Sequence, residues 1–239
     1  MKLHVKFSQL QLLTLSAAVL GLLLRIVLFT TGMDQKGMLI SGHWSTTGLL
    51  ALSVMICGLL IPGCALLSGS GQVPGRFHRL AAGAGCFGAA AAFLMSPVSP
   101  ASGSALPATC LGFLCATAFV FIGINRCLGR QPHFLAHVAV CLGFAIRMVS
   151  QYRLWSSDPQ LADYCFYMIS LVALMLTAYH SAAFDAGMGG FRRLRFFGLI
   201  SVYFCAVSLW GSDYSLFTGL CGFWVLTNLP CFQSPADSH

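Results

Sequence analysis

The residues most able to do chemistry lie in one polar stretch of an otherwise apolar sequence, from Arg147 to Gly187. Arg147 and, in another apolar run, Arg25 stand out, because an arginine at the centre of a membrane-spanning helix costs about 2.5 to 3.5 kcal/mol on insertion scales and needs a partner or water. We expect an outward-facing polar site for a small or anionic ligand, formed by Arg25, Arg147, Gln151, Arg153, Asp158, Asp163 and Tyr167. The alternative is that the two arginines reach the membrane interface and clamp the helices together.

Arg147 and Asp163 are the pair whose contact is predicted in most detail. Asp158 can cap a helix whose first turn begins with Pro159, since proline has no N–H to lose there. The short connection makes this helix the antiparallel neighbour of the helix that carries Arg147, and Arg147 and Asp163 then lie at a similar depth. We therefore predict an ion pair between them, with Arg25 as the first alternative partner of Asp163.

Three histidines form a weaker group at the other end of the same two helices. His133 and His137 are four residues apart and share one helix face, while His180 and Asp185 end the next helix on the same membrane side. Two imidazoles with a third nearby could ligate a metal, and a pair across two helices could hold a haem. The ordinary interpretation is that imidazoles beside an arginine-bearing loop bond water or headgroups. We expect no cofactor and keep His133, His137 and His180 as weak metal candidates.

Composition places these residues in a membrane. Hydrophobic residues make up 57% of the 239 residues, charged residues 8%, and the mean hydropathy is +0.81, whereas soluble domains carry about 25% charged residues. The net charge of +7 does not indicate a nucleic acid partner, because the basic residues lie in short clusters between apolar runs. The sequence contains no Glu, no G-x-S-x-G motif and no P-loop, so we favour a protein that is not an enzyme.

The apolar runs predict an all-α fold, a polytopic transmembrane helical bundle of about eight spans in one integral membrane domain, 1–239. The expected helices cover residues 10–31, 46–67, 80–95, 108–124, 132–151 and 159–185, with two short helices within 196–229. If the N-terminus is inside, nine Lys and Arg residues fall in inside segments and two in outside loops. This bias predicts a cell-membrane protein with both termini cytoplasmic.

Two short internal matches suggest that the chain is a tandem duplication. Residues 20–27 match residues 142–149, and residues 75–80 match residues 189–194. Both matches pair the same helices of a four-plus-four parallel repeat with halves 1–126 and 127–239. Coincidence in a sequence built from few residue types is the alternative.

Three segments carry a resemblance to known proteins: QYRLWSSDPQLADYCF, YHSAAFDAG and LLLRIVLFTTGM. With them, most of the chain resembles a group of bacterial multi-pass membrane proteins that have no assigned activity. The resemblance implies a membrane location and transfers no substrate, cofactor or residue role.

Two classes of function remain open. The first is a small permease-like or solute-binding membrane protein, favoured by the intramembrane charges and the suspected repeat. The second is a non-catalytic membrane scaffold, sensor or assembly factor, favoured by the absence of catalytic motifs. A haem-binding redox protein is a distant third. The expected partners are the lipid bilayer, a small-molecule solute, and a membrane partner or a second copy of the chain, with no nucleic acid.

Overall fold

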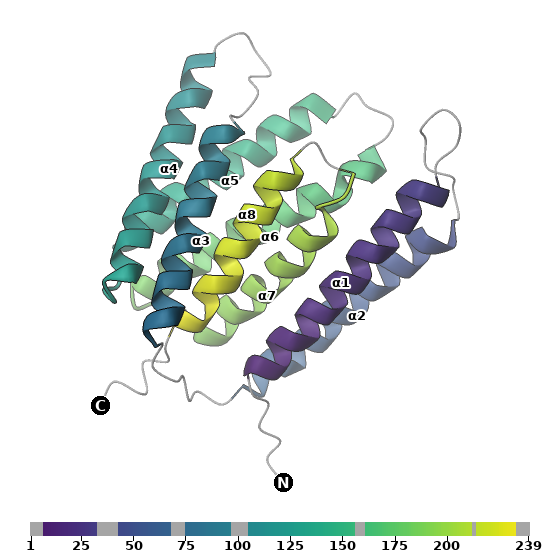
Figure 1. The fold of residues 1–239 in the computed structure, drawn as a ribbon, viewed down its shortest axis with the longest axis horizontal. Helices are drawn as coiled ribbons and strands as arrows, with labels where there is room; N and C mark the ends of the chain where they lie inside the picture. Colours follow the sequence, from purple (N-terminus) through teal and green to yellow (C-terminus); the bar gives the residue numbers. More distant parts are fainter. Residues whose placement is uncertain are drawn as a thin grey trace.

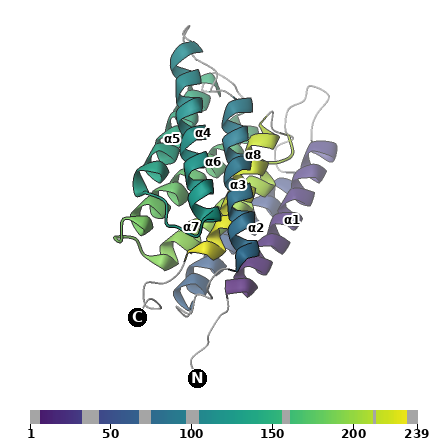
Figure 2. The same ribbon diagram turned by 60° about the vertical axis from the view of Figure 1, so that its left-hand side comes forward.

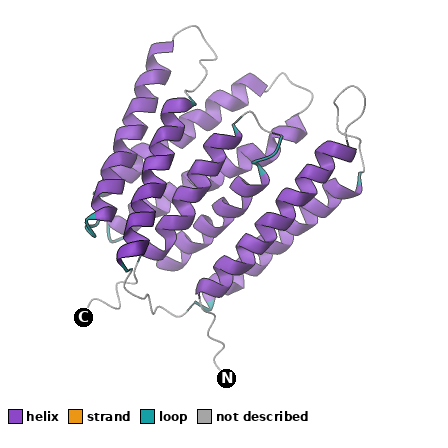
Figure 3. Ribbon diagram, in the orientation of Figure 1, coloured by secondary structure: helices purple, strands orange, loops and turns teal. Residues whose placement is uncertain are grey.

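The computed structural model describes residues 7–32, 43–67, 75–96, 105–155, 161–211 and 214–232. Within these ranges it is all helical, without β-strands (Figure 3). The elements are α1 (Phe7–Thr31), α2 (Trp44–Ala65), α3 (Arg76–Met95), α4 (Ala105–Cys127), α5 (Phe134–Trp155), α6 (Leu161–Asp185), α7 (Phe191–Val207), α8 (Ser215–Asn228) and the 3-10 helix η1 (Leu229–Cys231). The predicted fold class is confirmed, and each described helix overlaps one expected from the sequence.

Six of these helices are long and apolar enough to cross a membrane. They are α1 to α6, with the candidate spans of α4, α5 and α6 covering Thr109–Cys127, Phe134–Arg153 and Cys165–Asp185. The chain is therefore a multi-pass membrane protein, in which helices are favoured because lipid offers no partner for a free backbone N–H or C=O. Helix α7 has 17 residues and α8 has 14, so spans seven and eight stay predictions.

The helices pack in an alternating up-and-down order. Each of α3 to α8 packs along the next, and α8 packs along α3, so these six close into a ring (Figure 1). The hairpin of α1 and α2 packs on the outside of this ring against α7. In two views, the start of α1 and the end of α8 lie at the same end of the bundle (Figures 1 and 2).

The two ends of the bundle differ in their charged residues. We call the end where α1, α3, α5 and α7 begin the basic end, because it carries Arg76, Arg79, Arg126, Arg130, Arg192, Arg193 and Arg195. The opposite end carries Arg25, Arg147 and Arg153 late in their helices. The sequence predicts that the basic end faces the cytoplasm.

An aromatic cluster fills the ring between its ends. It consists of Phe93 from α3, Phe119 from α4, Phe144 from α5, and Phe217 and Trp224 from α8. Neighbouring ring centroids are 4.9 to 6.3 Å apart, mostly edge to face, as is favourable for aromatic pairs. The ring therefore has a closed, apolar middle.

Small residues let α3 approach α8 closely. A Cβ at Gly85 would lie 3.0 Å from the backbone of Trp224 and would overlap the hydroxyl of Thr227. All eleven cysteines are free thiols.

The duplication of residues 1–126 as 127–239 stays a prediction. In it the pair α1 and α2 corresponds to α5 and α6, and both pairs pack together. Helix α6 packs along α7, and its counterpart α2 also packs along α7 rather than α3. Superposition of the two halves is the test.

Candidate functional site

Arg147 is the centre of the polar site at the opposite end of the ring. Its side chain is 0% exposed. Nε donates a hydrogen bond to the hydroxyl of Tyr167 at 3.0 Å, and Nη1 donates one to the carbonyl of Ser96 at 2.6 Å. The guanidinium carbon lies 3.8 Å from the ring centroid of Phe217 and 5.0 Å from that of Tyr214. Arg147 thus joins α5 to α6, to the end of α3 and to the start of α8.

Some polar atoms of this site make no hydrogen bond with the residues that the structure describes. They are Nη2 of Arg147 and both polar atoms of the Gln151 amide, and all three are buried. Gln151 is also 0% exposed, and it lies one helical turn after Arg147 on the same face of α5. An unsatisfied buried polar group costs about 1 to 3 kcal/mol, and a charged one more. Nη2 of Arg147 and Nε2 of Gln151 could therefore donate hydrogen bonds to an anionic oxygen.

No carboxylate among the described side chains forms an ion pair with Arg147. Asp158 lies outside the described residues, and Asp163 is described only by its backbone in α6. The predicted pair of Arg147 with Asp163 therefore stays a prediction.

The remaining predicted site residues lie apart from Arg147. Arg25 is buried on α1, where its Nε donates to the carbonyl of Trp210 at 3.5 Å. Its guanidinium also lies 5.2 Å from the ring of Phe166 on α6. Arg153 is exposed at the end of α5. Of the seven predicted residues, the structure brings Arg147 and Tyr167 into contact and places Gln151 beside them.

A second buried polar cluster lies at the basic end, where α4, α5 and α6 meet. Nδ1 of His137 is 3.1 Å from Oδ2 of Asp185, and Nη2 of Arg126 is 3.9 Å from Oδ1. The ring of Phe232 covers the guanidinium of Arg126 at 4.4 Å. The helix expected over residues 108–124 ends before Arg126, and the sequence analysis did not predict the pairing of Arg126 with Asp185. The signal was present, because both residues end helices on the same predicted membrane side.

The three histidines do not gather into a metal site. Among the described residues, no group of three His, Cys, Asp or Glu side chains is close enough to hold a metal ion. His137 contacts Asp185, His180 stacks on Phe197 with centroids 4.7 Å apart, and His133 stacks on Phe134. The geometry offers no support for the haem interpretation.

The polar face of α6 is largely satisfied within the protein. The hydroxyls of Ser170, Thr177 and Ser181 donate to backbone carbonyls of α6 itself. Thr177 also bonds Ser201 of α7 at 2.7 Å. Thr177 therefore links α6 to α7, and the hydrogen bonds of these three hydroxyls are made within the protein.

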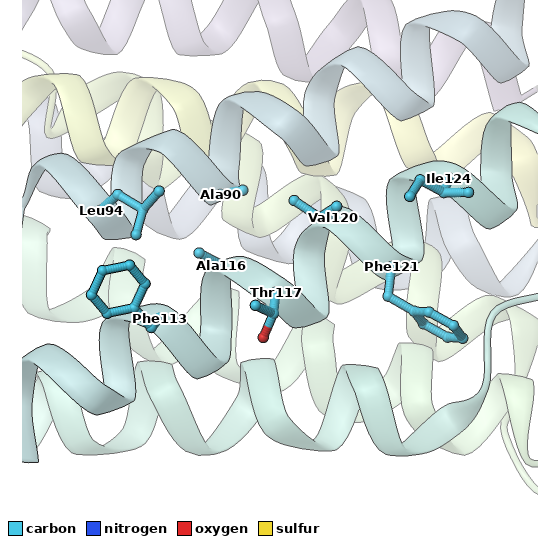
Figure 4. A pocket seen from close by; sticks show the side chains of 8 residues that line it. All are labelled: Ala90, Leu94, Phe113, Ala116, Thr117, Val120, Phe121 and Ile124. Carbon is cyan, nitrogen blue, oxygen red and sulfur yellow. The ribbon is translucent and has the colours of Figure 1, made fainter.

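An apolar groove lies on the outer surface between α3 and α4 (Figure 4). It has a volume of about 410 Å³ and is lined by Ala90, Leu94, Phe113, Ala116, Thr117, Val120, Phe121 and Ile124. Its one hydroxyl, on Thr117, donates to the carbonyl of Leu114. A groove without a free polar group suits lipid chains and offers no chemistry.

Comparison of the chain with family models, with curated proteins and with solved structures finds no match. The resemblance to bacterial multi-pass membrane proteins stays a prediction, and no residue role comes to the site from a known protein. Its chemistry rests on Arg147, Gln151 and their neighbours.

Proposed function

We propose that this membrane protein binds a small monovalent anion, such as a carboxylate, at Arg147 and Gln151, as a small permease or solute receptor would. The observation that carries the proposal concerns the buried Nη2 of Arg147 and the amide of Gln151, one helical turn away. Neither group makes a hydrogen bond with the described part of the chain. Buried charges in proteins are normally paired. A ligand would supply the missing acceptor.

The charge and donors of the site favour a monoanion. Arg147 contributes one fixed positive charge, and no described carboxylate neutralises it. Guanidinium groups bind carboxylates through parallel N–H donors, and these bonds are stronger than neutral ones. The amide of Gln151 can add one donor, or one acceptor for a hydroxyl group on the ligand. A small hydroxy acid or simple carboxylate fits these requirements.

The position of the site also supports passage of a solute. Phe217 contacts the guanidinium of Arg147 and also packs on Phe93 and Phe144, which close the middle of the ring. A ligand that moves Arg147 would therefore also move Phe217 and the aromatic cluster that closes the middle of the ring. A permease needs this kind of coupling between binding and closure.

A non-catalytic scaffold or sensor is the second candidate. The observation that favours it is that Arg147 already bonds Tyr167 and Ser96 and so clamps three helices. If the protein is a scaffold or sensor of this kind, Nη2 of Arg147 would bind no ligand. The two candidates make different predictions for a variant of Gln151, because its side chain forms no hydrogen bond with a described residue that would stabilise the bundle.

The test is ligand-dependent thermal unfolding of the purified protein in detergent. Sodium acetate, lactate and benzoate are compared with sodium chloride and sulfate at equal ionic strength. A ligand at 100 times its Kd stabilises the folded state by about 2.7 kcal/mol. We expect a carboxylate to raise the melting temperature of the wild type and of the exposed control Gln9→Leu, and not that of Gln151→Leu.

The scaffold function predicts a different result. Gln151→Leu would then raise the melting temperature by removing a buried unpartnered amide, and no anion would change the melting temperature of either protein. That outcome would overturn the binding proposal.

A further inference from the structure

Arg195 is a second buried arginine without a counter-ion, and it lies at the basic end of the bundle. It is 5% exposed. Its guanidinium carbon lies 3.8 Å from the ring centroid of Phe7 and 3.7 Å from that of Phe191. Phe7 begins α1 and Phe191 begins α7, so the two helix starts hold the guanidinium between them. Such contacts fix the plane of an arginine side chain.

Arg195 forms neither a hydrogen bond nor an ion pair with the residues that the structure describes. Its Nε is fully enclosed and has no partner. The two Nη nitrogens also make no hydrogen bond with a described residue, and they are not among the fully enclosed atoms. The Nη edge therefore opens to the surroundings of the bundle. The other buried arginines differ, since Arg25, Arg126 and Arg147 each contact a carbonyl or a carboxylate.

The charge distribution predicts that this edge lies at a membrane interface. Arg192 and Arg193 lie in the same helix turn and are exposed. The sequence predicts that this end of the bundle faces the cytoplasm, where the leaflet carries anionic lipids. Each Lys or Arg near such a surface contributes about 1 kcal/mol of attraction, but exposed arginines do so without a fixed geometry. Among Arg192, Arg193 and Arg195, it is Arg195 whose side chain is held in place, by the rings of Phe7 and Phe191.

We infer that Arg195 is a binding site for the phosphate of an anionic phospholipid, at the junction of the starts of α1 and α7. The phosphate oxygens would accept the free Nη donors, and the two phenyl rings would hold the guanidinium in the orientation for bidentate contact. The inference does not depend on the anion site at Arg147, because that site lies at the other end of the ring and uses other helices.

The test is native mass spectrometry of the protein titrated with phosphatidylglycerol or with phosphatidylcholine of the same acyl chains. Charge-assisted hydrogen bonds contribute about 1.5 to 3 kcal/mol, which corresponds to a loss of about tenfold or more in affinity. We expect Arg195→Gln to weaken the affinity for the most tightly bound phosphatidylglycerol by that factor. The exposed controls Arg192→Gln and Arg193→Gln should bind this phosphatidylglycerol with the affinity of the wild type. The affinity for phosphatidylcholine should be the same for all of these proteins.

A second variant distinguishes a loss of lipid binding from a folding defect of Arg195→Gln. Phe191→Leu keeps the charge of Arg195 but removes one ring, so it should also weaken phosphatidylglycerol binding while remaining folded in detergent. Equal losses for Arg195→Gln and Arg193→Gln would overturn the inference. So would stabilisation of the protein by sodium phosphate alone to the same extent as by phosphatidylglycerol, since the ligand would then be free phosphate.

Discussion

Asp185 is expected to be the most costly acidic residue to replace, because it neutralises a buried arginine. The side chains of Arg126 and Asp185 are 7% and 1% exposed, and their nearest charged atoms are 3.9 Å apart. Two unit charges at this distance interact by about 4 kcal/mol at an effective dielectric constant of about 20. Removing one partner of a buried pair costs about 3 to 5 kcal/mol, mainly because the other charge stays behind unpaired. We therefore expect Asp185→Asn to lower the free energy of unfolding by about 3 kcal/mol or more.

The measurement is a double-mutant cycle on the purified protein. The variants are Asp185→Asn, Arg126→Met and their combination, with the exposed Arg130→Met as the matched control. The free energy of unfolding is obtained by titration with a denaturing detergent in mixed micelles. The double variant should recover part of the loss caused by Asp185→Asn, since it removes the arginine that was left unpaired. Arg130→Met should change stability by less than about 0.5 kcal/mol.

An additive cycle would refute this reasoning. If the loss in the double variant equals the sum of the two single losses within about 0.5 kcal/mol, the two residues are not coupled. Asp185 would then stabilise the bundle through His137, whose Nδ1 is the closer group at 3.1 Å. The variant His137→Phe would in that case reproduce most of the loss.

Two further predictions concern membrane topology and helix packing. In a cysteine-depleted background, a single cysteine at Gln72 should be closed to an impermeant external reagent and one at Ser102 open to it, because the Lys and Arg distribution predicts that the basic end lies inside. The reverse labelling pattern would show that the topology is inverted. Gly85→Ala should lower the melting temperature, because its Cβ would lie 3.0 Å from the backbone of Trp224. The control Gly58→Ala should leave the melting temperature unchanged or raise it, because a Cβ at Gly58 would meet no atom within 4 Å. Equal effects of the two variants would show that α3 and α8 can separate at little cost.

The sequence by itself determined the fold class, the membrane location and the approximate helix bounds. Runs of about 20 apolar residues can satisfy their backbone polar groups in lipid only as helices, so composition and run length suffice for this step. The local part of the site was also predictable. Arg147, Gln151 and Tyr167 lie on two helices joined by a short connection, which makes those helices neighbours in any packing.

The tertiary structure decided the contacts between helices that are distant in the sequence. Alternating helix direction gives the depth of a residue, and for that reason Arg126, His137 and Asp185 could be placed at one end of the bundle. It does not give the rotation of each helix or its neighbours across the ring. The carbonyl of Ser96 and the ring of Phe217 reach Arg147 only because α3 and α8 close the ring beside α5, and Phe7 reaches Arg195 only because α1 packs on α7. These choices depend on side-chain packing over many residues at once, which a linear pattern of apolar and polar residues does not specify.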